Sequence, residues 1–484
     1  MRVFGVSAVA GVLGCLVAGV LAWRHHVPAS GWALLLAIAA IGAGLAMGVG
    51  FAIVRPRKFA LAGVFVAAVG IAWIVWAPGA PGVTVVVIDC LSDERLNEEL
   101  MPRTWALAEH AYRFENAHAQ SSWTRTSVAS MLTGSWPNRH QLYHVKPQPD
   151  RVSPDVPLLA PLVSASGRAT AMFAEQAQLD RAFGLAAGFD RYGFRDGRAN
   201  QIIDRYSRWR AFFRHVPHLA WIHILDIHKP YTPKHDNGMP IPTPAKPTGN
   251  PYDDQAELMR ELNQGGRKLR AGEWTTLRRA HESEVRELDT KLGQLWADLR
   301  ADGTLDTDWL VITADHGEAF GEHGWFTHGS TPWSELIEVP LVIRPPGGLR
   351  KARVLTTTAR HIDLAPTILG FFGLPAPGMD GRDLGPALRG ETMEDVPSFA
   401  EYFQETGRRI SVTFGNRSLV RTPEGDATYD LAADPGQQTP LPPDPELLAL
   451  LAEYLAKDGH AGGSVQTSDE TMEGLRALGY LDGP

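Results

Sequence analysis

Three short stretches of the sequence carry side chains that could bind a divalent cation or act as a nucleophile. Asp89 follows one apolar run, Asp315 and His316 follow another, and Thr124 stands at the start of a helical pattern. Carboxylate and imidazole groups are ligands for Zn²⁺, Mg²⁺, Mn²⁺ or Ca²⁺, and a nearby cation lowers the pKa of a hydroxyl. Asp89, Asp315 and His316 together with a Thr oxygen, for which Thr124 is a candidate, would make a site for one divalent ion, and that ion would make the Thr hydroxyl a better nucleophile.

The segment around Thr124 allows two interpretations. It reads "SSWTRTSVASMLTG", with Val128, Met131 and Leu132 at helical spacing and Gly134 as a stop signal. Hydroxyl residues at a helix start are ordinary N-cap residues. Alternatively, Thr124 is a nucleophile at the positive end of the helix, where an anionic group is stabilised. The segment alone leaves both interpretations open.

A second group of metal-type side chains follows the same logic. Asp226, His228 and His328 are predicted to bind a second divalent ion or the substrate. Taken singly, an Asp after a strand is often a turn or cap residue, and His323 and His328 could be loop residues without ligands. Four such places in one chain favour a shared site.

Three continuous apolar runs could position these groups as buried strands of a parallel sheet. They begin at Val83, reach Leu225 in "LAWIHILDIHKPY" and reach Ile312 in "DWLVITADHGE". An amphipathic helix is expected at His281–Arg300 between them. Alternating strands and helices predict an α/β fold with a mostly parallel central sheet flanked by helices, and ligands bind at the carboxyl edge of such a sheet.

Two other regions differ from this pattern. The Pro-rich segment 229–251 is expected to be an irregular loop that shapes the substrate site. Residues 401–484 predict a small α+β subdomain of antiparallel hairpins and a helix that starts at Asp444 and ends at Gly459. The predicted catalytic domain spans residues 79–400.

Residues 1–78 predict a three-helix transmembrane anchor. The apolar runs Val3–Trp23, Trp32–Val54 and Phe59–Trp76 each approach the ~20 residues that cross a bilayer. Arg2 and the basic residues at 55–58 place the N-terminus and the second loop in the cytoplasm. The expected location is therefore the cell membrane, as a multi-pass protein that contacts the lipid bilayer, with the catalytic domain extracytoplasmic.

Composition excludes some classes of function. The net charge is −8, and no basic face with interleaved aromatic residues suggests nucleic acid binding. Cys15 lies within the first apolar run, which leaves Cys90 as the one cysteine of the predicted exported part. An intrachain disulfide bond within that part is therefore not expected.

From Val83 onwards, the chain resembles the sulfatase branch of the alkaline-phosphatase superfamily. The stretch "VVVIDCLSDERL" resembles the first strand with its metal Asp, here Asp89, and "SSWTRTSVASMLTGSWP" resembles the nucleophile helix, which implies that Thr124 is the nucleophile. "HILDIHKPY" and "TADHGEAFGEHGWFTHG" resemble the remaining metal and substrate motifs. The resemblance implies an alkaline-phosphatase-like fold, one or two divalent metal ions (Zn, Mn, Mg or Ca), and an anionic ester substrate such as a lipid head group or a glycan.

The sequence departs from true sulfatases at the nucleophile. Those enzymes oxidise a Cys or Ser in a C/S-x-P-x-R motif to formylglycine, whereas this chain reads "TRTSV", with Thr124 first and Val128 in place of Arg. Thr nucleophiles are typical of membrane-anchored phosphoethanolamine and phosphoglycerol transferases. The resemblance therefore implies a hydrolase or transferase of phosphate esters. The alternatives are a sulfuric ester hydrolase that uses Thr directly, and an inactive protein that binds anionic glycans or lipid head groups.

Overall fold

The computed structural model describes residues 81–143, 151–174, 176–194, 198–232, 241–404 and 407–457. The three predicted membrane-spanning runs lie outside these residues. Within the described ranges, no helix has the length and the apolar composition that crossing a bilayer requires.

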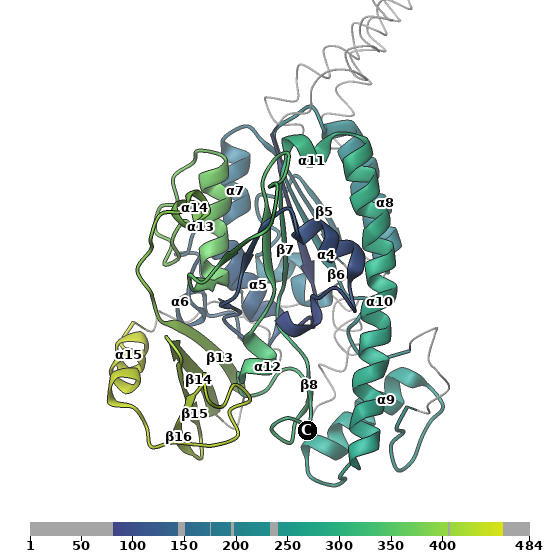
Figure 1. The fold of residues 1–484 in the computed structure, drawn as a ribbon, viewed down its shortest axis with the longest axis vertical. Helices are drawn as coiled ribbons and strands as arrows, with labels where there is room; N and C mark the ends of the chain where they lie inside the picture. Colours follow the sequence, from purple (N-terminus) through teal and green to yellow (C-terminus); the bar gives the residue numbers. More distant parts are fainter. Residues whose placement is uncertain are drawn as a thin grey trace, which may run out of the picture.

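An eight-stranded sheet forms the centre of the molecule (Figure 1). In spatial order its strands are β11 (Arg353–Leu355), β2 (Tyr112–Phe114), β10 (Leu341–Arg344), β7 (Trp309–Ala314), β1 (Val83–Ile88), β6 (His218–Ile224), β4 (Ala169–Ala174) and β5 (Arg191–Phe194). Neighbouring strands run parallel except at β10, which is antiparallel to both of its neighbours. The predicted α/β fold with a mostly parallel central sheet is confirmed.

Helices cover both faces of the sheet (Figure 1). One face packs against α4 (Pro102–Ala108), α8 (Ala199–Phe213) and α10 (Ala271–Ala301), and the other against α5 (Thr124–Thr133), α7 (Leu159–Ala165) and α13 (His361–Phe371). Shorter helices are α6 (Pro137–His140), α9 (Pro251–Asn263), α11 (Thr304–Thr307), α12 (Ser334–Ile337) and α14 (Gly385–Arg389). Two-stranded pairs are β3 (Ala117–His118) with β12 (Ala359–Arg360), and β8 (Ala319–Phe320) with β9 (Phe326–Thr327).

The α10 helix is longer than predicted. It begins ten residues before His281, because Arg270 and Glu273 form a capping box and Leu277 buries its side chain against a third apolar cluster. Its last turn ends at Ala301, next to the expected end at Arg300.

Alternation along the central strands decides which face each side chain reaches. On β1, Val85 and Val87 pack on the α5 face, while Val86 and Ile88 pack on the α10 face. Val83 pairs with Leu219 of β6 and Trp309 of β7, so the three strands are in register and end at one edge. The residues that follow them therefore meet at this edge.

The α5 helix has the predicted bounds. Gly134 ends it in a left-handed conformation with φ of 60°. Every residue of α5 is buried, so the helix has no solvent-facing stripe. Its N-cap is Trp123, which makes no side-chain cap hydrogen bond.

The C-terminal part forms the predicted hairpins and helix (Figure 1). A four-stranded antiparallel sheet contains β13 (Ser398–Gln404), β14 (Gly407–Phe414), β15 (Arg417–Thr422) and β16 (Gly425–Asp430). Asp444 caps α15 (Pro445–Leu455), whose apolar face packs on this sheet. The helix ends at Leu455, before the expected stop at Gly459, which lies outside the described residues. The buried Glu401 of β13 accepts hydrogen bonds from Tyr143 and Tyr454, which ties this subdomain to the catalytic domain.

Candidate active site

The four residues predicted to hold the first ion meet at the carboxyl edge of the sheet. Asp89 follows β1, Asp315 and His316 follow β7, and Thr124 is the first residue of α5. Thr124 Oγ1 lies 3.1 Å from His316 Nε2 and 3.4 Å from Asp89 Oδ2. His316 Nε2 is 3.8 Å from Asp89 Oδ1 and 3.5 Å from Asp315 Oδ2. Asp89, His316 and Asp315 are fully buried, so their mutual approach takes place away from bulk water.

The strand phase explains this convergence. Asp89 continues the alternation of Val85 and Val87, and Asp315 continues that of Val311, so both side chains emerge on the face covered by α5. The N-terminus of α5 lies above this edge, where its positive end faces the two carboxylates.

The donor set fits a divalent cation. Asp315 Oδ2 is buried and has no hydrogen-bond partner among the described residues, which is costly for a carboxylate oxygen unless a cation binds it. Burial and the adjacent Asp89 carboxylate raise the pKa of Asp315 well above its usual value. Burial also acts to raise the pKa of Asp89, but the hydrogen bond with His223 and the nearby His228 and His316 hold it well below the usual value. Two carboxylates at such close range are the ligands that hard or borderline divalent ions prefer.

Local hydrogen bonds orient the groups around Thr124. His316 Nδ1 donates to the carbonyl of Gly317 at 2.9 Å, which leaves the lone pair of Nε2 directed at Thr124 Oγ1. Because Trp123 is the N-cap residue, Thr124 is not the N-cap of α5, and the interpretation of Thr124 as an ordinary capping residue does not hold. Ser122, the residue before the N-cap, donates its hydroxyl to the carbonyl of Ser330.

Ser127 anchors α5 to the end of β7. Its hydroxyl donates to the carbonyl of Asp315 at 2.6 Å and lies 2.8 Å from His361 Nδ1, all within the buried interior.

We expect Ser127→Ala to lower the free energy of unfolding by about 1–3 kcal/mol, because it leaves a buried carbonyl and a buried imidazole nitrogen without this partner. Thermal or denaturant unfolding measures the change. Thr290→Ala removes an exposed hydroxyl from α10 and should shift stability by less than about 0.5 kcal/mol. Equal stabilities of the two variants would contradict the anchoring role of Ser127.

Only two of the three residues predicted to bind a second ion or the substrate, Asp226, His228 and His328, lie close together. His228 and His328 are neighbours, with ring centroids 4.9 Å apart. Asp226 does not join them, so this part of the prediction is wrong. Its Oδ2 accepts from the backbone N–H of Ala199 at 2.6 Å and its Oδ1 pairs with Lys291, which places it at α8 and α10 on the opposite face of the sheet. After Asp226, the chain turns, and His228 N donates to the carbonyl of Leu225.

Several site residues were missed by the sequence prediction. Cys90 Sγ lies 2.9 Å from Asp89 Oδ1 and 3.4 Å from His328 Nδ1. His223 Nε2 lies 3.4 Å from Asp89 Oδ2 and 3.8 Å from Asp315 Oδ2, and Gln176 Nε2 donates to Asp89 Oδ2 at 3.0 Å. A signal for His223 exists in the sequence, because it is the one ionisable residue inside the apolar stretch of β6 after His218 and shares the phase of Trp221.

The described residues contain three metal-competent groups at this edge, each with ligand atoms within 4.8 Å of one another. They are Asp89–His223–Asp315, Asp89–Cys90–His316 and Cys90–His228–His328. The geometry thus supports at least one cation-binding position at the edge, without identifying the ion.

Arg125 is buried rather than solvated. Its guanidinium carbon lies 3.5 Å from the ring centroid of Phe183, next to the candidate nucleophile. A cation in this place contributes positive potential to a site for an anionic group.

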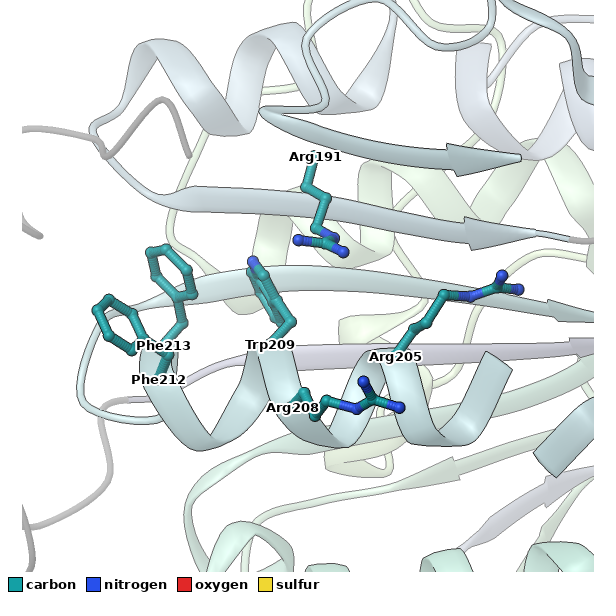
Figure 2. Close-up of a pocket in the computed structure, with 6 residues that line it drawn as sticks. All are labelled: Arg191, Arg205, Arg208, Trp209, Phe212 and Phe213. Carbon is teal, nitrogen blue, oxygen red and sulfur yellow. The ribbon is translucent and has the colours of Figure 1, made fainter. Parts of the chain in front are cut away.

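A separate pocket of about 250 Å³ lies between β5 and α8 (Figure 2). It is lined by Arg191, Arg205, Arg208, Trp209, Phe212 and Phe213. The lining contains neither a nucleophile nor a metal-type side chain, so this pocket is not the catalytic site.

Comparison with known proteins identifies the class that this fold and site define. The sulfatase family model matches residues 83–374, and a model for the C-terminal region of N-sulphoglucosamine sulphohydrolase matches residues 321–455. The first match covers more than half of the 484 residues. The chain belongs to the sulfatase family, which confirms the predicted resemblance to the sulfatase branch of the alkaline-phosphatase superfamily.

Individual relatives include sulfatases and phosphorus ester hydrolases. The chain is 32% identical to the extracellular sulfatase SULF-1 homolog of Drosophila melanogaster over 26% of this chain and 11% of that protein. It is 28% identical to the multifunctional alkaline phosphatase superfamily protein PehA of Trinickia caryophylli over 40% of this chain and 41% of the relative. The phosphonate monoester hydrolase structure from Silicibacter pomeroyi superposes with a TM-score of 0.60 at 20% identity, covering 80% of this chain and 99% of the other. The matched segments thus span less than half the length of these two curated relatives.

Proposed function

We propose that this protein is a metal-dependent ester hydrolase or transferase that acts on phosphate esters through Thr124. The observation that carries the proposal is the position of Thr124 Oγ1, 3.1 Å from His316 Nε2 and 3.4 Å from Asp89 Oδ2 at the first residue of α5. Similarity to sulfatases and to a phosphonate monoester hydrolase supports an anionic ester as the substrate class.

Asp89, Thr124, Asp315 and His316 would hold a divalent ion, with His223 close enough to contribute. Such an ion, when bound, lowers the pKa of the Thr124 hydroxyl and neutralises charge on the ester oxygens. Asp89 and Asp315 fix the position of the ligand set, and Gln176 fixes the Asp89 carboxylate by donating to Oδ2. The positive end of α5 and the buried Arg125 favour the anionic group of the substrate at Thr124.

The reaction proceeds in two displacements. Thr124 Oγ1 attacks phosphorus, the Oγ1–P bond forms, and the bond from phosphorus to the leaving oxygen breaks. Asp89 Oδ2, which accepts the Thr124 hydroxyl at 3.4 Å, would take the proton from Oγ1, and the leaving oxygen takes up a proton from solvent. Water or an acceptor hydroxyl then attacks phosphorus and releases Thr124. In this second displacement the attacking water or hydroxyl loses its proton to solvent, and Asp89 returns its proton to Oγ1. His228 and His328 face the same edge and would contact the leaving group or a second ion.

The choice of phosphate over sulfate rests on the residue at position 124. Thr cannot be oxidised to formylglycine, so a covalent intermediate on it must be resolved by a second attack rather than by elimination. Val128, which stands where the formylglycine motif has Arg, has an uncharged side chain and packs fully buried in the apolar core, so that positive charge is absent at this position. A sulfuric ester hydrolase that uses Thr directly is the second candidate, because the curated relatives include sulfatases.

A quenched-reaction experiment tests these alternatives. The full chain, loaded with a divalent ion, is mixed with an aryl phosphate, an aryl phosphodiester or an aryl sulfate, quenched in acid and digested. A phosphate adduct on the peptide that contains Thr124 supports the proposal, and a sulfate adduct, separable by accurate mass, supports the second candidate. Tight binding of the esters with neither an adduct nor turnover would instead indicate an inactive binding protein.

We also propose that residues 1–78 anchor the catalytic domain at the outer side of a membrane. The support is the three apolar runs and the basic residues Arg2, Arg55, Arg57 and Lys58. The described part begins at Pro81 and enters β1 at Val83, at the sheet edge opposite to Asp89. At about 3.3 Å per residue, roughly 20 Å of strand separates the predicted membrane end from the site.

Reporter fusions test the topology. A periplasmic-type reporter, active only outside the cytoplasm, should be active when fused after residue 80 and inactive when fused in the loop at residues 55–58. A cytoplasmic reporter should show the reverse. Cytoplasmic activity from the fusion after residue 80 would disprove an outward catalytic domain.

A further inference from the structure

Three side chains beside the proposed catalytic ion form a cluster of their own. Cys90, His228 and His328 are all buried, and each offers a ligand atom within 4.8 Å of the other two. Zn–S bonds of about 2.3 Å and Zn–N bonds of about 2.0 Å set neighbouring ligand atoms of a tetrahedral zinc roughly 3.3–3.7 Å apart. The ligand atoms of the three side chains, all within 4.8 Å of one another, approach this spacing, and Cys90 Sγ lies against the His328 ring, 3.4 Å from its Nδ1.

The backbone adopts a left-handed conformation at Cys90 and at the residue before His328. Cys90 has φ of 65°, and Thr327, immediately before His328, has φ of 71°. A β-branched residue rarely adopts the left-handed region, and such strain persists where the surrounding structure holds it in place. In both loops the unusual conformation belongs to the cluster residue or to its neighbour.

Hydrogen bonds orient both imidazoles as metal ligands are commonly oriented. His228 Nδ1 donates to the carbonyl of Lys229 at 2.7 Å, which leaves Nε2 with its lone pair. His328 Nδ1 lies 3.0 Å from Glu318 Oε1, and Tyr231 donates its hydroxyl to Glu318 Oε2 at 2.8 Å. A carboxylate behind a histidine is a typical outer partner of a metal site.

The charge around the cluster also favours a second cation. Asp89, Asp315 and Glu318 are fully buried carboxylates within one edge of the sheet. One divalent ion balances Asp89 and Asp315, and the buried Lys229 acts on Glu318, which leaves the charge of a Cys90 thiolate to be balanced by a second cation. Buried carboxylates require compensating positive charge, and a bound cation supplies it.

We infer that Cys90, His228 and His328 form a second, thiolate-containing metal site that selects zinc. A soft sulfur ligand favours Zn²⁺ over the hard ions Mg²⁺ and Ca²⁺, which prefer oxygen. The thiol transfers its proton to solvent when the sulfur–zinc bond forms. This inference deepens the proposed function, on which it rests for the neighbouring ion at Asp89.

Metal titration of the full chain in detergent tests the inference. The metal-free protein should bind two equivalents of Zn²⁺, and two of Co²⁺, with a near-ultraviolet thiolate-to-cobalt charge-transfer band. Cys90→Ser should retain one equivalent, lose the band, and bind the second ion at least about 100-fold more weakly, since even outer-partner changes cost 10–100-fold. Cys15→Ser is the matched control, because Cys15 is the only other cysteine, and it should keep both ions and the band.

The outcomes separate this inference from the proposed function. A single equivalent that carries the thiolate band would assign Cys90 to the ion at Asp89 and overturn the second site. Two equivalents without the band would overturn the thiolate ligand. Because the band is measured on the unaltered chain, the test does not depend on the folding of Cys90→Ser. Turnover with one sulfur-free equivalent would leave the proposed function intact, whereas absence of any bound ion would contradict both.

Discussion

Thr124→Ala is expected to remove nearly all ester turnover while the fold and most of the bound metal remain. The change deletes the oxygen that lies 3.1 Å from His316 Nε2 and only one ligand of the proposed ion. Loss of an activated nucleophile typically lowers the rate by several powers of ten. Steady-state turnover of an aryl phosphate, metal content and thermal unfolding of the same preparation measure the three quantities.

Two further substitutions test whether the loss of activity comes from the hydroxyl of Thr124 itself. Thr124→Ser retains the hydroxyl and should keep part of the activity. Thr126→Ala is the matched control, because Thr126 is a buried threonine of the same helix whose hydroxyl donates instead to the carbonyl of Leu142. It should cost stability but leave turnover within a few-fold of wild type. If Thr124 acted only as a helix cap, alanine would cost ~1 kcal/mol and activity would survive.

The large elements were predictable because their burial leaves a strong pattern in the sequence. The run from Val83 is buried along its full length as β1, and α5 has the expected bounds because Gly134 ends it in the left-handed region. The hairpin between β14 and β15 turns through Gly415 and Asn416, a residue pair typical of tight hairpin turns. In each case the local chemistry of a few residues agrees with the tertiary structure.

The composition of the site was harder to predict because it depends on loops beyond the strand ends. Asp89 and Asp315 keep the phase of their strands and reach the α5 face, as a sheet edge predicts. Asp226 lies two residues beyond the end of β6 and emerges on the α10 face, where Lys291 binds it. The turn after Asp226 then brings His228 back to the site. Spacing alone contains no information about that turn.

The position of Cys90 in the site could not be predicted from the sequence either. A cysteine after a buried strand usually behaves as a small apolar residue, and nothing in its neighbours predicts a left-handed conformation. With φ of 65°, its sulfur instead lies between Asp89 and His328. His223 could have been found from the sequence, because its phase on β6 is the phase of the α5 face.

His316→Ala is expected to remove the ion at Asp89 and, with it, the catalytic activity. Among the described residues, this imidazole is the one that lies within 3.8 Å of Thr124 Oγ1, Asp89 and Asp315 together, so its loss leaves His223 as the remaining imidazole at the two buried carboxylates. Metal content should fall by one equivalent, and turnover by several powers of ten, because the hydroxyl of Thr124 is then no longer activated. Elemental analysis and turnover of the same sample measure both effects.

His323→Ala provides the matched control for this variant. His323 belongs to the same loop region, but its Nδ1 binds Glu335 at 2.8 Å and its ring stacks on Trp333, away from the three metal-competent groups. It should retain the metal and the activity. Chelation of the unaltered chain should reproduce the His316→Ala result, and added metal should restore activity to the unaltered chain but not to the variant. Full turnover in a chelated, metal-free sample would contradict the requirement for a cation. It would show that the protein groups around Thr124 activate its hydroxyl by themselves.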